Sequence, residues 1–184
     1  MKPLLLFVPV FALSAGLAAA QEVCPDPPDH AAELEGILAE IQAAPDERAA
    51  RLLSDYLWEL WTDAPDAAAQ ELLDRGMALR ESYAFLEARE VFDQLVDYCP
   101  DYAEGYNQRA FASFLRRDYG AALWDLERTL ELNPRHVGAL SGKALTLLGM
   151  GRMDEGQAAL RAALALNPWL SERALLQEPP GQPI

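Results

Sequence analysis

Residues 106–134 read YNQRAFASFLRRDYGAALWDLERTLELNP, and this stretch decides the fold. Its closing proline, Pro134, has counterparts at Pro100 and Pro168, so three prolines stand 34 residues apart. The segments that end in these prolines share one pattern of small and large apolar residues. A fixed 34-residue repeat of helix-sized units indicates a solenoid of helical hairpins, in which each unit buries its apolar face only against its neighbours.

Aligned by their prolines, the repeating units comprise residues 69–102, 103–136 and 137–170. Small residues coincide at the eighth and twentieth places, where we expect two helices to cross closely: Gly76, Ala110 and Ala144, then Ala88, Ala122 and Gly156. Large apolar residues coincide at the fourth, seventeenth and twenty-fourth places: Leu72, Tyr106 and Leu140, then Phe85, Tyr119 and Met153, then Phe92, Leu126 and Leu160. The large residues predict a continuous core. Because proline cannot continue a helix interior, each unit is expected to end in a turn.

The pattern resembles the tetratricopeptide repeat (TPR), most clearly in Arg109-Ala110, Asp118-Tyr119-Gly120-Ala121-Ala122 and Leu130-Glu131-Leu132-Asn133-Pro134. The resemblance covers residues 69–170 and implies an all-α fold, a right-handed solenoid of helical hairpins. At the seventh place the sequence departs from the family, because Arg75, Arg109 and Lys143 stand where leucine is frequent. At the twenty-seventh place Leu95 and Thr129 replace a usual alanine. We expect looser local packing at these places.

Two further segments flank the repeats. Residues 21–68 carry two apolar helical faces separated by Pro45-Asp46, which predict an N-terminal helical hairpin acting as a degenerate repeat or a cap. Its Trp58 and Trp61 are interpreted as core residues that cover the exposed end of the solenoid. Residues 171–184 are expected to form a short capping helix followed by a frayed tail.

The first twenty residues have the features of an export signal. Lys2 precedes an apolar stretch, and residues 18–20 are alanines, so residues 1–20 are predicted to be a cleaved signal peptide. The apolar stretch is too short for a membrane-spanning helix, so no stable membrane anchor is expected after cleavage. We expect an exported protein, with a bacterial periplasm as its location. Export favours a disulfide between Cys24 and Cys99, the alternative being two unrelated buried thiols.

The charge balance excludes one class of partner. The chain has 29 acidic and 15 basic side chains, a formal net charge of −14. Nucleic-acid binding is disfavoured, because phosphate backbones are held by clustered Lys and Arg. The carboxylates either attract a basic partner or only solvate the outer faces of the helices.

No catalytic constellation emerges from the sequence. The two histidines, His30 and His136, lack the partner spacing of a metal site and are interpreted as surface or turn residues. No serine has the Gly-x-Ser-x-Gly setting of an exposed nucleophile. We therefore expect a non-enzyme with no metal and no cofactor.

The resemblance implies a function in protein binding. In proteins of this family the first helix of each unit lines a concave groove that takes up a partner's peptide or helix. The groove-facing places of this chain are Leu73, Met77, Arg80, Asn107, Phe111, Phe114, Ser141, Leu145 and Leu148. Their mostly apolar character disfavours the carboxylate clamp of chaperone-binding members and favours a hydrophobic segment, with Phe111 and Phe114 as anchors.

Two alternatives for the groove remain open at this point. One is that the groove residues pack beneath the N- or C-terminal tail of the chain itself. The other is that the same surface seals a homodimer, which would make the protein a structural, self-associating one.

Overall fold

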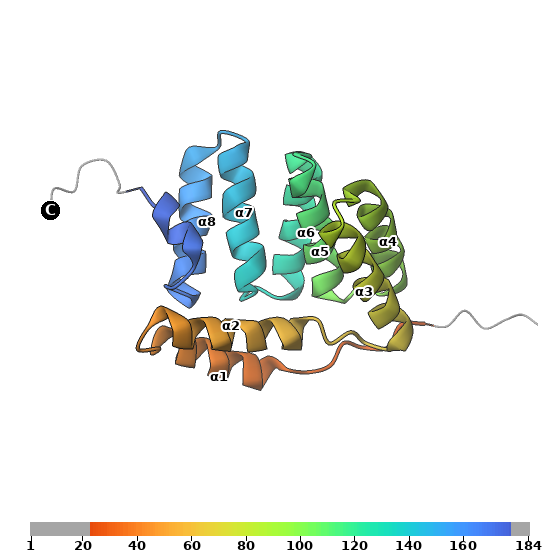
Figure 1. Ribbon diagram of the computed structural model, residues 1–184, viewed down its shortest axis with the longest axis horizontal. Helices are drawn as coiled ribbons and strands as arrows, with labels where there is room; N and C mark the ends of the chain where they lie inside the picture. The colour runs from red at the N-terminus through yellow and green to blue at the C-terminus, as the bar shows by residue number, and fades with distance from the viewer. Residues whose placement is uncertain (1–22, 178–184) are drawn as a thin grey trace, which may run out of the picture.

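The computed structural model describes residues 23–177, so the predicted signal peptide and the last seven residues lie outside the described part. Within residues 23–177 the chain forms eight α-helices and one 3₁₀ helix, with no β-strand (Figure 1). The elements are α1 (Ala31–Gln42), α2 (Glu47–Trp61), α3 (Ala67–Glu81), α4 (Phe85–Tyr98), α5 (Ala103–Leu115), α6 (Tyr119–Leu132), α7 (Val137–Gly149), α8 (Met153–Leu166) and η1 (Ser171–Leu175). None of these helices has the length and apolar character needed to cross a bilayer.

Local sequence explains where several helices begin and end. The carboxylates of Asp46, Asp66 and Asp118 each accept a hydrogen bond from the backbone N–H three residues further on, which caps α2, α3 and α6. The helices α4, α6 and α8 each end two residues before a repeat proline. The predicted turns therefore lie where the prolines place them.

The repeats pack as three hairpins, α3–α4, α5–α6 and α7–α8, which stand side by side (Figure 1). Their small residues permit close contact between the two helices of a hairpin. A Cβ atom built on Gly76 would lie 2.3 Å from Cε1 of Phe92, so α3 and α4 meet at that point without room for a side chain. Phe92 and Leu160 are fully buried and Leu126 is 3% exposed, as a continuous core requires. The predicted all-α helical-hairpin solenoid is confirmed.

The seventeenth place does not follow the predicted core. Met153 is 43% exposed, and Phe85 and Tyr119 are only partly buried. This place opens each second helix, where the chain has just turned and solvent reaches the side chain. The apolar residues at this place therefore border the core instead of filling it.

Two of the three cations at the seventh place, Arg109 and Lys143, connect successive hairpins. Arg109 on α5 binds Asp93 on α4 with an Nη1–Oδ1 distance of 2.9 Å, and Lys143 on α7 binds Glu127 on α6 with an Nζ–Oε1 distance of 3.1 Å. Arg109 also binds Asp125, which is 2% exposed, with an Nη2–Oδ1 distance of 2.6 Å. At Arg109 and Lys143, ion pairs join the helices where looser packing was expected. The pair of Arg109 with Asp125 is largely desolvated.

The N-terminal hairpin does not stack beside α3 as a fourth unit would. Figure 1 shows α1 and α2 lying along one end of the upright hairpins, beneath them and across their direction. The indole Nε1 of Trp169 donates to the carbonyl of Ile41 at 3.2 Å, and Nε2 of Gln42 donates to the carbonyl of Ala165 at 3.0 Å. Ile37, Leu38 and Ile41 lie in one buried cluster with Val137, and the partly buried Leu166 and Trp169 pack against it. The hairpin therefore joins the last repeat through residues that lie 123 and 128 positions apart in the sequence.

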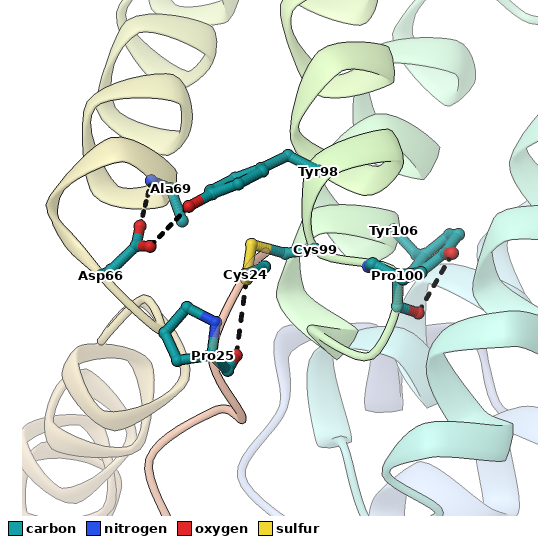
Figure 2. Close-up of a disulfide and its surroundings, with 8 residues drawn as sticks. All are labelled: Cys24, Pro25, Asp66, Ala69, Tyr98, Cys99, Pro100 and Tyr106. Atoms are coloured by element: carbon teal, nitrogen blue, oxygen red, sulfur yellow. Dashed lines mark hydrogen bonds between the residues drawn. A yellow bond between two sulfur atoms is a disulfide. The ribbon is translucent and has the colours of Figure 1, made fainter. Parts of the chain in front are cut away.

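A disulfide fixes the segment that precedes this hairpin. Cys24 is bonded to Cys99, directly after α4, with a Cα–Cα distance of 5.2 Å and a sequence separation of 75 residues (Figure 2). Cys99 is 1% exposed and belongs to the core cluster of α3 and α4. The hairpin is thus held at one end by a covalent bond and at the other by contacts with α8.

Candidate functional site

A cavity of about 250 Å³ lies on the face of the repeats that α5 and α7 share. Its apolar lining comes from Trp58, Ala110, Phe111, Phe114, Leu126, Leu145 and Leu170. Asn107, Ser141, Thr146 and Glu172 add polar atoms to the same lining. The cavity is therefore built by the first helices of two repeats together with α2 and the segment around η1.

Three aromatic side chains, Trp58, Phe111 and Phe114, contribute to this lining. Phe111 is 44% exposed although it lies in the middle of α5. The guanidinium carbon of Arg80 lies 4.8 Å from the centre of the Phe111 ring, and the Phe114 ring lies 5.7 Å from that of Tyr119. An exposed aromatic ring beside an apolar cavity is an arrangement typical of an interaction site.

The structure brings five of the nine predicted groove residues together around this cavity: Asn107, Phe111, Phe114, Ser141 and Leu145. Arg80 lies beside them through its contact with Phe111. Leu73 is fully buried in the core of α3 and α4, and Met77 packs against the same cluster. Leu148 contacts Gly156 across its own hairpin, since a Cβ on Gly156 would lie 2.8 Å from the Leu148 side chain. Leu73 and Leu148 therefore serve the packing of the repeats.

Polar groups at the groove are mostly engaged within the chain. Nδ2 of Asn107 donates to both carboxylate oxygens of Glu104 at 3.1 and 3.2 Å, and Arg80 donates to the side-chain oxygen of Gln108. Burial lowers the pKa of the Arg80 guanidinium, while Glu81 and Glu104 act in the opposite direction. The hydroxyls of Ser141 and Thr146 are buried and have no hydrogen-bond partner among the described residues.

Among the lining residues that were not predicted for the groove, three lie outside the paired helices α3 to α8. Trp58 was assigned to the core with Trp61; Trp61 is buried in that cluster, and the partly buried Trp58 packs against it and also lines the cavity. Leu170 and Glu172 come from the segment after α8. The segments outside the repeats thus border the groove but leave the cavity unfilled by residues 23–177.

A second, larger cavity of about 540 Å³ lies between the N-terminal hairpin and the ends of the repeats. His30, His136, Asp63 and Glu104 are among its lining residues. His136 was interpreted as a surface or turn residue; it closes the turn between α6 and α7, as predicted, but it is fully buried and does not lie at the surface. His30 is partly buried and pairs with Asp63, with an Nε2–Oδ2 distance of 2.8 Å. Among residues 23–177 no group of His, Cys, Asp and Glu is arranged to hold a metal ion.

His136 connects several elements from its buried position. Its Nδ1 accepts a hydrogen bond from the backbone N–H of Ala139, which caps α7, so the proton of the neutral ring resides on Nε2. Nε2 then donates to Glu104 at 2.8 Å. Asn107 and Gln108 also donate to Glu104, so this buried carboxylate has three side-chain donors. This network fixes the start of α7 relative to α5.

Comparison with known proteins agrees with the fold. No family model matches the chain. A TPR repeat-containing protein of Rhizobium etli is 29% identical over 118 residues, which cover 64% of this chain and 58% of the relative. The chain therefore spans little more than half of the length of that relative.

Solved structures with similar folds are TPR domains. The first TPR domain of Spaghetti (RPAP3), bound to an HSP90 peptide, aligns with a TM-score of 0.57 at 20% identity and covers 58% of this chain and 85% of its own. The TPR2B domain of yeast Sti1, in a complex with pHsp70, aligns with a TM-score of 0.56 at 22% identity, covering 60% and 91%. The chain has the tetratricopeptide repeat fold and is similar to TPR proteins. In this chain the aligned repeats are accompanied by a hairpin that crosses their ends.

Proposed function

We propose that this protein is a non-catalytic, exported TPR scaffold that holds a segment of a partner protein against α5 and α7. TPR domains generally mediate protein–protein interactions, and the domains of Spaghetti and Sti1 are solved with bound peptide or partner. The observation that carries the proposal is the apolar cavity flanked by the exposed Phe111. An unfilled apolar cavity with an exposed aromatic at its edge gains free energy when a partner removes both from water.

The character of the groove favours an apolar contact over capture of a terminal carboxylate. The groove amide, Asn107, already donates to Glu104, and Arg80 is bonded to Gln108 and lies over Phe111. Drawing these groups toward a partner would break bonds within the chain. A segment that inserts a side chain into the cavity leaves these bonds intact.

The proposal places the protein outside the cytoplasm, in a bacterial periplasm. The Cys24–Cys99 disulfide supports this location, because disulfides persist in oxidising compartments. The signal-like residues 1–20 support it from the sequence. We do not propose catalysis. The ionisable groups of the second cavity, His136 with Glu104 and His30 with Asp63, are bonded to each other within the chain.

Crosslinking capture from the exported fraction of the native host, followed by mass spectrometry, tests the proposal. The wild-type protein is compared with Phe111→Asp, which places a charge at the cavity, and with Leu86→Asp, a matched change at an exposed residue of α4. Circular dichroism first establishes that both variants are folded. We expect one or more proteins to be retained by the wild type and by Leu86→Asp and to be lost from Phe111→Asp.

Two other outcomes would count against this proposal. Equal retention by all three proteins would show that Phe111 does not contribute to binding. Retention of copies of the chain alone, together with a concentration-dependent mass in light scattering, would make the groove a self-association surface.

A further inference from the structure

The groove cavity contains one carboxylate that has no counter-ion. Glu172, in the first turn of η1, is half-buried and lines the cavity. It accepts a hydrogen bond from the hydroxyl of its neighbour Ser171 at 3.2 Å and forms no ion pair with any residue of 23–177. A half-buried carboxylate beside apolar surface loses part of its hydration and is stabilised by a cation that approaches it.

Aromatic residues share the cavity with this carboxylate. Trp58, Phe111 and Phe114 all line it, and the faces of such rings attract cations. Arg80 already uses the Phe111 ring in this way, with its guanidinium carbon 4.8 Å from the ring centre. The combination of aromatic walls and one carboxylate suits a group that is apolar along its length and positive at its end.

The size of the cavity limits its occupant to one side chain. Benzene occupies a protein cavity of roughly 150 Å³, whereas most drug-sized ligands need at least about 300 Å³. The cavity of about 250 Å³ lies between these limits. The stems of arginine and lysine are apolar and their ends carry the charge, so either side chain meets the requirements of length and polarity.

We infer that the partner segment presents one arginine or lysine to this cavity, with the apolar stem along the aromatic lining and the charged end paired with Glu172. This inference rests on the proposed protein-binding function and adds the chemical class of the residue that is recognised. The net charge of −14 on the chain favours the same partner, because it attracts a basic segment over distance while Glu172 selects its position. An uncharged apolar side chain would fill the cavity but would leave Glu172 without a counter-ion.

Selection from a phage-displayed library of random peptides tests the inference. The oxidised protein is compared with Glu172→Gln, which removes the carboxylate charge, and with Glu87→Gln, which removes an equal charge from an exposed residue of α4. We expect the wild type and Glu87→Gln to enrich peptides with arginine or lysine at one fixed position. Glu172→Gln should lose this enrichment while Phe111→Asp loses peptide binding altogether.

The affinity of the best selected peptide then gives a second measurement. Replacing its basic residue by norleucine, which keeps an apolar stem, should weaken binding to the wild type about tenfold or more, as loss of a charge-assisted contact predicts. The same replacement should have little effect on binding to Glu172→Gln.

The possible failures are distinguishable. Enrichment of an uncharged apolar residue at the fixed position, unaffected by Glu172→Gln, would overturn this inference and leave the proposed function in place. If no peptide is enriched, or if selected peptides bind Phe111→Asp as well as wild type, the proposed function fails together with the inference.

Discussion

The imidazole of His136 stacks on the indole of Trp61, with 4.0 Å between ring centres and 19° between ring planes. Trp61 ends α2, and His136 caps the start of α7, so this stack joins the N-terminal hairpin to the third repeat. The same imidazole donates to Glu104 on α5. One buried ring thus connects three elements that are distant in sequence.

Replacement of His136 by Asn should destabilise the fold by about 2–3 kcal/mol, because Glu104 loses a buried donor and Trp61 loses its stacked ring. Asn is itself a good N-cap, so the start of α7 should persist. Urea denaturation monitored by circular dichroism measures the change. The control is His30→Asn at the half-exposed His30–Asp63 pair, which should cost less than about 1 kcal/mol. Equal losses in both variants would contradict the structural role assigned to His136.

Gly76→Ala should destabilise the protein although alanine is the better helix former. The added Cβ would lie 2.3 Å from Phe92, and relieving such overpacking costs about 1–3 kcal/mol, more than the gain in helix propensity of about 1 kcal/mol. Gly36→Ala on α1 is the matched control, since nothing lies within 4 Å of its Cβ position and the propensity gain remains. Thermal unfolding should lower the melting temperature of the first variant and raise that of the second. A rise in both would show that α3 and α4 can separate without cost.

Reduction of the Cys24–Cys99 bond should lower the free energy of unfolding by about 4 kcal/mol in the chain-entropy model, because the bond closes a loop across 75 residues. Urea denaturation with and without a thiol reductant measures this difference. A Cys24→Ser, Cys99→Ser double variant, which has no bond to reduce, should show no response to the reductant. Coincident curves for oxidised and reduced wild type would overturn the prediction.

The cap of α3 should make stability depend on pH in acid. Hydrogen bonds from the backbone N–H of Ala69 and from the hydroxyl of Tyr98 lower the pKa of Asp66 below its usual 3.8 (Figure 2). A lowered folded-state pKa gives stability that is complete above the unfolded pKa and is lost as pH falls through the folded value. In Asp66→Asn the neutral amide still caps the helix but does not titrate there. Urea midpoints of the wild type should therefore fall more steeply than those of Asp66→Asn below pH 3.8. Parallel curves would show that the cap does not titrate in this way.

The repeats could be predicted from the sequence because their contacts are local and periodic. The close approach at Gly76 and the burial of Phe92 follow from the places that they share with other units. The groove was predicted in part, since the α5 and α7 positions such as Phe111 and Leu145 face the cavity. Leu73 was assigned to the same surface by its place but is buried, because it belongs to the core cluster that Phe92 and Cys99 also form.

The position of the N-terminal hairpin could not be predicted from the sequence. Its apolar faces indicate that two helices exist, but their period does not specify which surface they cover. The decisive contacts, such as Trp169 with Ile41 and Asn167 with Ser54, join residues more than a hundred positions apart. The burial of His136 and the position of Trp58 at the cavity depend on that same placement. A solitary histidine carries no sequence signal that separates a buried helix cap from a surface turn.

The hairpin that crosses the repeats also determines the order in which the chain completes its fold. Its residues Ile41 and Gln42 are synthesised first, yet their partners Trp169 and Ala165 follow 128 and 123 positions later. Local hairpins form fast, whereas contacts between distant segments form slowly. The repeats should therefore assemble before the N-terminal helices dock, and the apolar side chains of Ile37 and Leu38 stay exposed to aggregation during that interval. The N-terminal part of the molecule thus becomes native only after Ala165 and Trp169, near the other end of the chain, are available for contact.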